Sequence, residues 1–128
     1  MIIQQVGSGR GDTASNAYLR LRATLAELRH MAASGARPTR RLALRAGTLA
    51  ANPAMSSLLL RCTRPTHMGA ARLWLEISEY LDDIDQIVGV LRLAAQCAAI
   101  GGNTTFARNC MKQAADAQRQ RQARAASH

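Results

Sequence analysis

The chain has 128 residues, 48% of them hydrophobic but only 3% aromatic, and seventeen Lys and Arg oppose eight Asp and Glu to give a net charge of +9. Its apolar runs stay short of the roughly 18–20 residues that cross a bilayer, and MIIQQV lacks the basic start and long apolar stretch of a signal peptide. The three cysteines, an odd number, do not suit a disulfide framework, so we expect a soluble cytoplasmic protein.

Alanine and leucine supply most of the hydrophobic residues, and both favour helices, whereas strands are enriched in β-branched and aromatic side chains. The composition therefore predicts an all-α protein, and the helices identified along the chain make it a small helical bundle of about five helices with one long amphipathic helix. We expect one helical domain over residues 13–117, a flexible N-terminal arm over 1–12, and a disordered tail rich in Arg and Gln over 118–128.

The arm leads into the stretch VGSGRGDTAS at residues 6–15, whose glycines are typical of nucleotide-binding loops. A dinucleotide-binding loop needs a third glycine where Asp12 stands, together with alternating strands and helices that this sequence lacks. A P-loop needs a lysine beside its last glycine, and the only lysine is Lys112. The Arg10-Gly11-Asp12 tripeptide could serve adhesion only outside a cell. We therefore interpret the stretch as a mobile lead-in to the first helix.

A first helix is predicted from the capping side chains of Asp12 to Ser15 as far as Ser34, with Gly35 marking its end. Apolar residues recur along it at alternating spacings of three and four, which is typical of a helix that buries one face. This stripe consists of Tyr18, Leu21, Leu25, Leu28 and Ala32.

Basic charge concentrates in the leading part of the chain. Residues 1–72 carry eleven arginines and two acids, whereas residues 73–128 carry six basic and six acidic residues. The segment 37–64 contains no acid, and two short helices are predicted in it, one capped by Thr39 and the other starting at Asn52-Pro53. The arginines that we expect to bind nucleic acid are Arg37, Arg40, Arg41, Arg45, Arg61 and Arg64.

Arginine is well suited to backbone contacts, because its guanidinium group forms paired hydrogen bonds with phosphate oxygens and each neutralised phosphate releases counterions. The segment lacks the aromatic side chains on which single-strand binders stack bases. We therefore expect an electrostatic, largely sequence-independent contact with a DNA or RNA backbone. The plainer alternative is a solvated basic surface with no ligand.

The two short helices also invite comparison with a helix-turn-helix motif. Ala43 and Gly47 have the four-residue spacing that is frequent in its first helix, whereas Pro53 falls where the second helix would have an interior apolar residue. The second helix offers few side chains for reading bases. A DNA-binding regulator that uses residues 39–62 therefore remains an alternative.

The segment from His67 to Ile100 predicts one long amphipathic helix (about 67–100), closed by Gly101-Gly102 and interrupted only by Gly89. The acids between residues 76 and 85 lie off its apolar seam, where they form a solvated face or meet the basic segment. The seam itself could serve an intramolecular core or, over residues 70–98, a homo-oligomer or another protein subunit. Its nine apolar positions are Ala70, Trp74, Ile77, Leu81, Ile84, Val88, Leu91, Ala95 and Ala98.

A last helix is predicted from its cap at Asn103 and carries Phe106, Cys110, Ala114 and Ala117 before the polar tail begins.

The sequence offers no constellation typical of catalysis, so we expect a protein that is not an enzyme, with no cofactor and no metal. Cys62, His67, Cys97 and Cys110 form a Cys₃His set, but only the first two have a spacing near that of a zinc site, and buried free thiols are the expected alternative. The carboxylates between residues 76 and 85 have no histidine partners of the kind that di-iron bundles use.

Three functions follow from these features. The first is a nucleic-acid-backbone-binding accessory protein or subunit of a nucleoprotein complex. The second is a helical protein-interaction module, such as an adaptor, a secretion chaperone or a phage-type inhibitor, that binds an acidic protein. The third is the helix-turn-helix-like regulator. All three depend on the basic leading half of the chain, and none involves a membrane.

Overall fold

The protein is all-α, as the composition predicts. A computed structural model describes residues 8–63 and 67–126, with side chains from residue 15 onward. These residues form six α-helices and one short 3₁₀ helix and contain no strand, so the predicted small helical bundle is confirmed. The elements are α1 (Ser8–Ser34), α2 (Arg40–Ala50), η2 (Pro53–Met55), α3 (Ser56–Cys62), α4 (His67–Ser78), α5 (Ile84–Ile100) and α6 (Thr104–Ala126).

Short polar side chains and glycines mark the helix ends where the sequence predicts them. The Thr39 hydroxyl accepts a hydrogen bond from the Leu42 amide (3.1 Å), and the Asn103 side-chain oxygen accepts one from the Phe106 amide (3.0 Å). Gly35 follows α1 with φ +77°, and Gly102 follows α5 with φ +82°, a conformation that side chains other than glycine rarely adopt. Local capping therefore accounts for most of the boundaries.

The prediction of one long helix over 67–100 is wrong. The helix ends at Ser78, the next three amides bond to carbonyls three residues back, and α5 begins after Asp83. The Asp83 carboxylate accepts a hydrogen bond from the Gln86 amide (3.1 Å) and caps α5. The cause of the break is therefore Asp83, an N-cap inside an otherwise helical pattern, and α5 continues through Gly89 without interruption.

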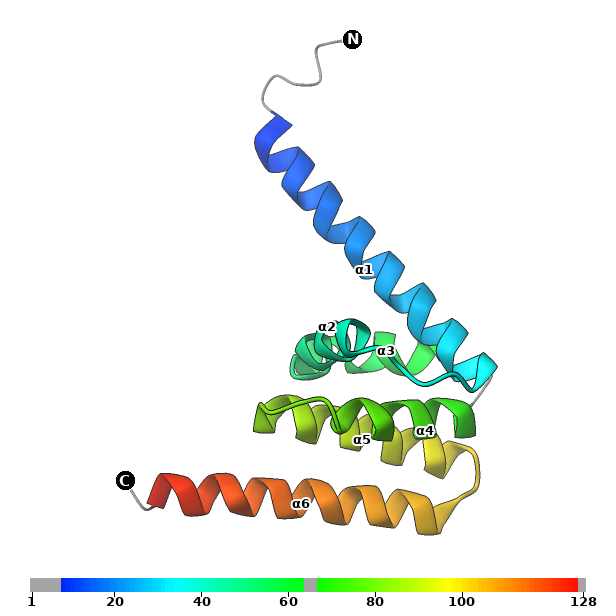
Figure 1. Ribbon diagram of the computed structural model, residues 1–128, viewed down its shortest axis with the longest axis vertical. Coiled ribbons are helices and arrows are strands. Elements are labelled where there is room, and N and C mark those ends of the chain that lie inside the picture. Colours follow the sequence, from blue (N-terminus) through cyan, green and yellow to red (C-terminus); the bar gives the residue numbers. More distant parts are fainter. Residues whose placement is uncertain (1–7, 64–66, 127–128) are drawn as a thin grey trace.

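The break folds the predicted seam back on itself, because α4 and α5 become an antiparallel pair that packs together (Figure 1). Eight of the nine seam residues are buried within the chain, and Ile84 is half-buried. The seam therefore belongs to the intramolecular core. This corrects the interpretation that the seam could bind a second copy or another subunit.

Both ends of the chain are more helical than predicted. Helix α1 begins at Ser8, inside the predicted arm, and α6 continues to Ala126 through most of the predicted disordered tail; residues 1–7 and 127–128 lie outside the described part. Ala, Gln and Arg are good helix formers, so the helical state persists after the apolar pattern stops. Arg121 also pairs with Asp85, which ties the end of α6 to α5.

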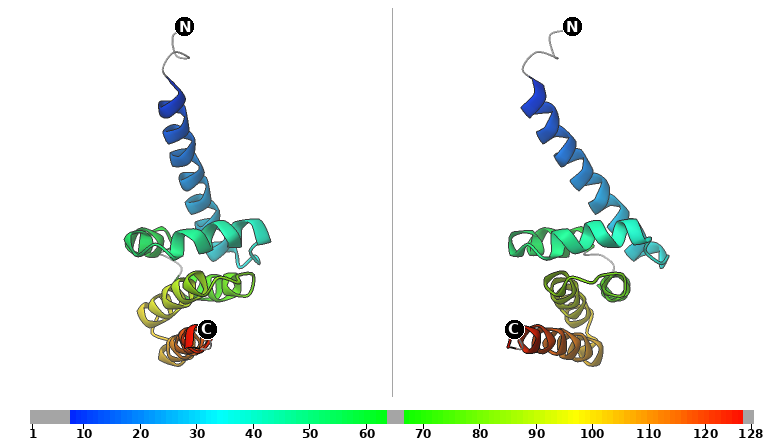
Figure 2. Two further views of the ribbon diagram at one scale, coloured as in Figure 1. Left: turned by 90° about the vertical axis from the view of Figure 1, so that its left-hand side faces the viewer. Right: turned by 60° about the vertical axis from the view of Figure 1, so that its left-hand side comes forward.

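The helices form layers from which one helix projects. Helices α4, α5 and α6 lie antiparallel in succession, α2 and α3 cover α4 and α5, and α1 leaves the stack at an angle (Figures 1 and 2). The core contains Trp74, Leu73 and Ile77 of α4, none of which has any exposed surface. The C-terminal part of α1 packs on this core through Leu28 and Ala32, whereas residues 15–20 are all exposed.

Candidate nucleic-acid interface

The amphipathic pattern of α2 determines where its arginines point. One face, made of Leu42, Ala43, Ala46, Gly47 and Ala50, is buried against α4 and α5. Arg40, Arg41 and Arg45 precede or alternate with these residues in the sequence and lie on the opposite side of the helix. All three are exposed. The helix therefore presents a cationic outer face that carries no acid.

Carboxylates of the chain neutralise only part of this charge. Arg37 lies 3.6 Å from a Glu79 oxygen, with both side chains more than 60% exposed, and Arg45 lies 3.9 Å from a Glu27 oxygen. Such long, solvated ion pairs contribute little and yield readily to a competing anion. Among the side chains that the structure describes, those of residues 15–63 and 67–126, no ion pair forms at Arg40, Arg41 or Arg61.

The six predicted arginines do not form one site. Arg37, Arg40, Arg41 and Arg45 come together at α2 and the loop before it. Arg61 lies on α3 and lines a separate groove with His67 and Ile100. Arg64 lies outside the described residues.

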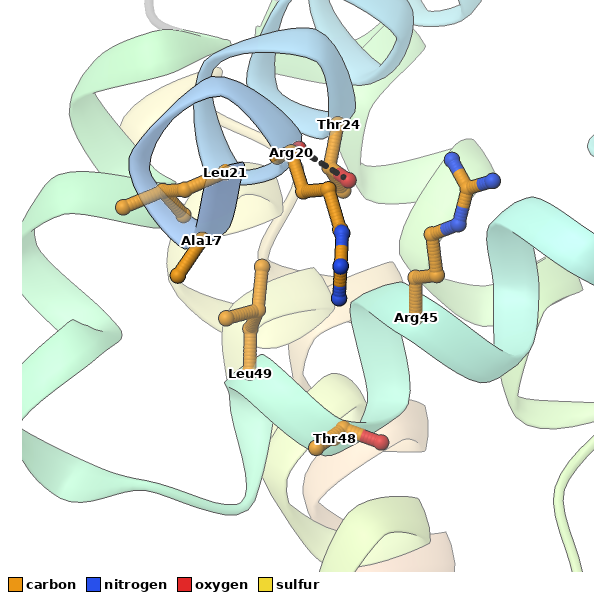
Figure 3. A pocket seen from close by; sticks show the side chains of 7 residues that line it. All are labelled: Ala17, Arg20, Leu21, Thr24, Arg45, Thr48 and Leu49. Atoms are coloured by element: carbon orange, nitrogen blue, oxygen red, sulfur yellow. Dashed lines mark hydrogen bonds between the residues drawn. The ribbon is translucent and has the colours of Figure 1, made fainter. Parts of the chain in front are cut away.

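The structure adds Arg20, which the sequence analysis missed. A groove of about 580 Å³ separates α1 from α2, and the Arg20 side chain reaches across it from α1 toward α2 (Figure 3). Arg45 stands on α2, and Figure 3 shows Ala17, Leu21 and Leu49 together on the opposite side of Arg20 from Arg45, where they form the apolar floor of the groove. The sequence indicates only that Arg20, Thr24 and Glu27 share one side of a helix, and this does not reveal that the side faces α2.

Two threonines of this groove direct their hydroxyl hydrogens into their own helices. Thr24 donates to the Arg20 carbonyl (2.9 Å), and Thr48 donates to the Leu44 carbonyl (3.1 Å). The guanidinium groups of Arg20 and Arg45 are therefore the principal donors that face a ligand. The groove therefore has an apolar floor with two cationic side chains along one edge.

Other basic residues of the leading half have structural partners. The Arg29 Nε donates to the Cys62 carbonyl (3.1 Å), and Arg72 donates both to Glu76 (2.7 Å) and to the Met31 carbonyl (3.3 Å). These contacts fasten α1 to α3 and α4. Part of the charge asymmetry therefore holds the fold together.

The helix-turn-helix comparison remains a prediction. Ala43 and Gly47 are both buried, and the two helices are joined through η2, whose cap is an Asn52 oxygen that accepts from the Ala54 amide (3.0 Å). Helix α3 has seven residues and exposes Ser57 and Arg61.

The three cysteines are free and buried. Desolvation raises the pKa of Cys62 and of Cys97 to about 11; near Cys62, Arg29 partly opposes the increase. Burial also raises the pKa of Cys110. The thiols are therefore protonated, and no three His, Cys, Asp or Glu side chains in the described ranges gather to share a metal ion.

We predict that alkaline pH destabilises the fold through these thiols. Ionisation near the ordinary pKa of 9.0 stabilises the unfolded chain, whereas Cys62 and Cys97 ionise in the folded protein only near 11. The free energy of unfolding should fall by about 2 kcal/mol between pH 7.5 and pH 10, measured by urea titration. The Cys62→Ala/Cys97→Ala variant should lose much less over this range; an equal loss would assign the effect to other groups.

None of the helices that the structure describes has the length and apolar character needed to cross a bilayer. Comparison of the chain with protein-family models, curated proteins and solved structures finds no match. The site must therefore be interpreted from its own chemistry.

Proposed function

We propose that the protein is a non-enzymatic, cytoplasmic accessory protein that binds nucleic-acid backbone through the outer face of α2. The observation that supports this most strongly is the group of exposed guanidinium groups at Arg40, Arg41 and Arg45, of which only Arg45 has an acidic neighbour, set on a helix whose other face is anchored in the core. A rigid helix holds these groups at fixed spacing, which lowers the entropic cost of binding a regular polyanion.

The chemistry favours phosphate over base recognition. Arginine forks pair with phosphate oxygens, and α2 carries no aromatic residue on which a base could stack. Arg20 stands across the groove and can add a further phosphate contact from α1. The proposed contact is therefore insensitive to base sequence.

A charge-matched pair of variants tests this proposal. Arg40→Ala/Arg41→Ala/Arg45→Ala should weaken binding of a labelled oligonucleotide of about 20 nucleotides by about a hundredfold, measured by fluorescence anisotropy at near-physiological salt. The control Arg92→Ala/Arg108→Ala/Lys112→Ala removes the same charge from exposed positions of α5 and α6 and should cost less than about threefold.

Circular dichroism should show that both variants keep the helical content of the parent protein. Equal weakening by the two variants would mean that net charge alone attracts the oligonucleotide, and α2 would lose its assigned role. Absence of binding by the parent protein would reject the function itself.

A further inference from the structure

The apolar stripe of α1 is covered by the bundle at only one end. Leu28 and Ala32 are 0% and 3% exposed, whereas Leu21 and Leu25 are half-buried and Tyr18 is 59% exposed. The repeat itself is unbroken from residue 18 to residue 32. The half of the stripe that leaves the stack therefore keeps the pattern of a packed helix without a packing partner in the described part of the chain.

The uncovered half meets the groove between α1 and α2. Leu21 of the stripe lines that groove beside Ala17, and Leu49 of α2 completes its floor (Figure 3). The two helices diverge from this point, as Figure 2 shows. An apolar floor between two diverging helices is a surface on which a third helix can pack.

The positive charge around the floor favours an occupant that carries negative charge. Arg20 and Arg45 lie along one edge of the floor, and Arg22 lies on α1 with its guanidinium group 5.8 Å from the centre of the Tyr18 ring. Glu27, at one end, is the only acid on α1 among residues 15–34. An occupant with acidic side chains beside its own apolar stripe would complement these arginines.

A second copy of the chain does not fit this description. The exposed acids Glu79, Asp82, Asp83 and Asp85 lie in and beside the turn between α4 and α5, two helices whose apolar side chains pack mainly into the core. Pairing α1 with α1 of another copy would bring Arg20 and Arg22 of each copy against those of the other. The described helices therefore offer no free acidic amphipathic face.

We propose that the groove between α1 and α2 binds an acidic amphipathic helix of a partner protein. The partner helix places its apolar stripe on Leu21 and Leu49 and its acids against Arg20 and Arg45. This inference does not rest on the nucleic-acid contact, because Arg40 and Arg41 do not line the groove. Arg45 belongs to both surfaces, so the two ligands would compete in part.

Synthetic peptides of about 18 residues provide the test. One carries leucines at helical spacing flanked by glutamates, a second carries the same leucines flanked by lysines, and a third has the glutamate peptide's composition in scrambled order. Titration calorimetry should show binding of the first peptide, with the other two weaker by about tenfold or more.

Matched variants then locate the site. Arg20→Glu and Leu21→Ala should each weaken the glutamate peptide by about tenfold, whereas Arg92→Glu and Leu19→Ala, at exposed positions outside the groove, should change it by less than twofold. Thermal unfolding of each variant verifies its fold.

Equal binding of the scrambled and ordered peptides would overturn the proposal, and so would an unchanged affinity of Arg20→Glu. It would also be overturned if Leu21→Ala weakened oligonucleotide binding and the glutamate peptide did not bind, since the groove would then belong to the nucleic acid. Loss of peptide binding with oligonucleotide binding intact leaves the function of α2 standing, so the two proposals fail separately.

Discussion

Replacing Gly89 with alanine should destabilise the protein by about 3 kcal/mol, despite alanine's higher helix propensity. A Cβ atom at this position would lie 2.4 Å from the Ala50 carbonyl oxygen and 2.8 Å from its carbon. Both atoms belong to the backbone at the end of α2, so no rotamer change can move them away. Relief of the clash requires α2 to move away from α5, and this opens the core beneath the arginine face.

Gly47→Ala is the matched control, because its Cβ would meet the end of a flexible side chain, Leu81 Cδ2 at 2.7 Å. A rotamer change can relieve much of that contact, and the gain in helix propensity offsets part of the remainder. Urea unfolding followed by circular dichroism measures both variants. A Gly89→Ala protein as stable as the parent would show that α2 and α5 do not approach this closely.

The second large effect is expected at Trp74, where Trp74→Ala should cost about 4 kcal/mol. The indole has no exposed surface and is the largest of the fully buried side chains in the described core. Truncation removes its contacts and leaves a cavity at the centre of α4, which packs against α1, α2 and α5. The same urea titration measures the loss.

Trp74→Phe should cost much less, about 1 kcal/mol. The Trp74 Nε1 is buried, and no acceptor for its hydrogen lies in the described residues. Phenylalanine removes that unpaired donor, which offsets part of the lost volume. A Trp74→Phe loss as large as that of Trp74→Ala would show that the indole N–H has a partner that matters for stability.

Local signals in the sequence predicted several helix boundaries at which a capping side chain or a glycine is found in the structure. Thr39, Asn52 and Asn103 each accept the expected backbone hydrogen bond, and Gly35 and Gly102 adopt the expected left-handed conformation. The long helix was wrong because heptad spacing is the same for one continuous helix and for two helices packed face to face. The decisive residue was Asp83, whose capping role depends on a few local hydrogen bonds.

The candidate site was predictable only within one element. The amphipathic pattern around Arg40, Arg41 and Arg45 implies that they face outward, and they do. Arg20 of α1 lies across a groove from Arg45 because of the angle between the two helices. No local sequence pattern encodes this angle. Tertiary packing likewise determines that Arg61 lies apart from the α2 arginines, and local patterns do not encode this either.

The most direct test of the central claim is the salt dependence of oligonucleotide binding by the unmodified protein. If α2 binds phosphates, the logarithm of the affinity should fall linearly with the logarithm of salt concentration, with a slope of about −3 for three to four contacts. Arg40→Ala/Arg41→Ala/Arg45→Ala should leave a slope of about −1 or shallower, because at most the Arg20 contact remains. A slope near zero for the parent protein, or one that the three substitutions leave unchanged, would contradict the account.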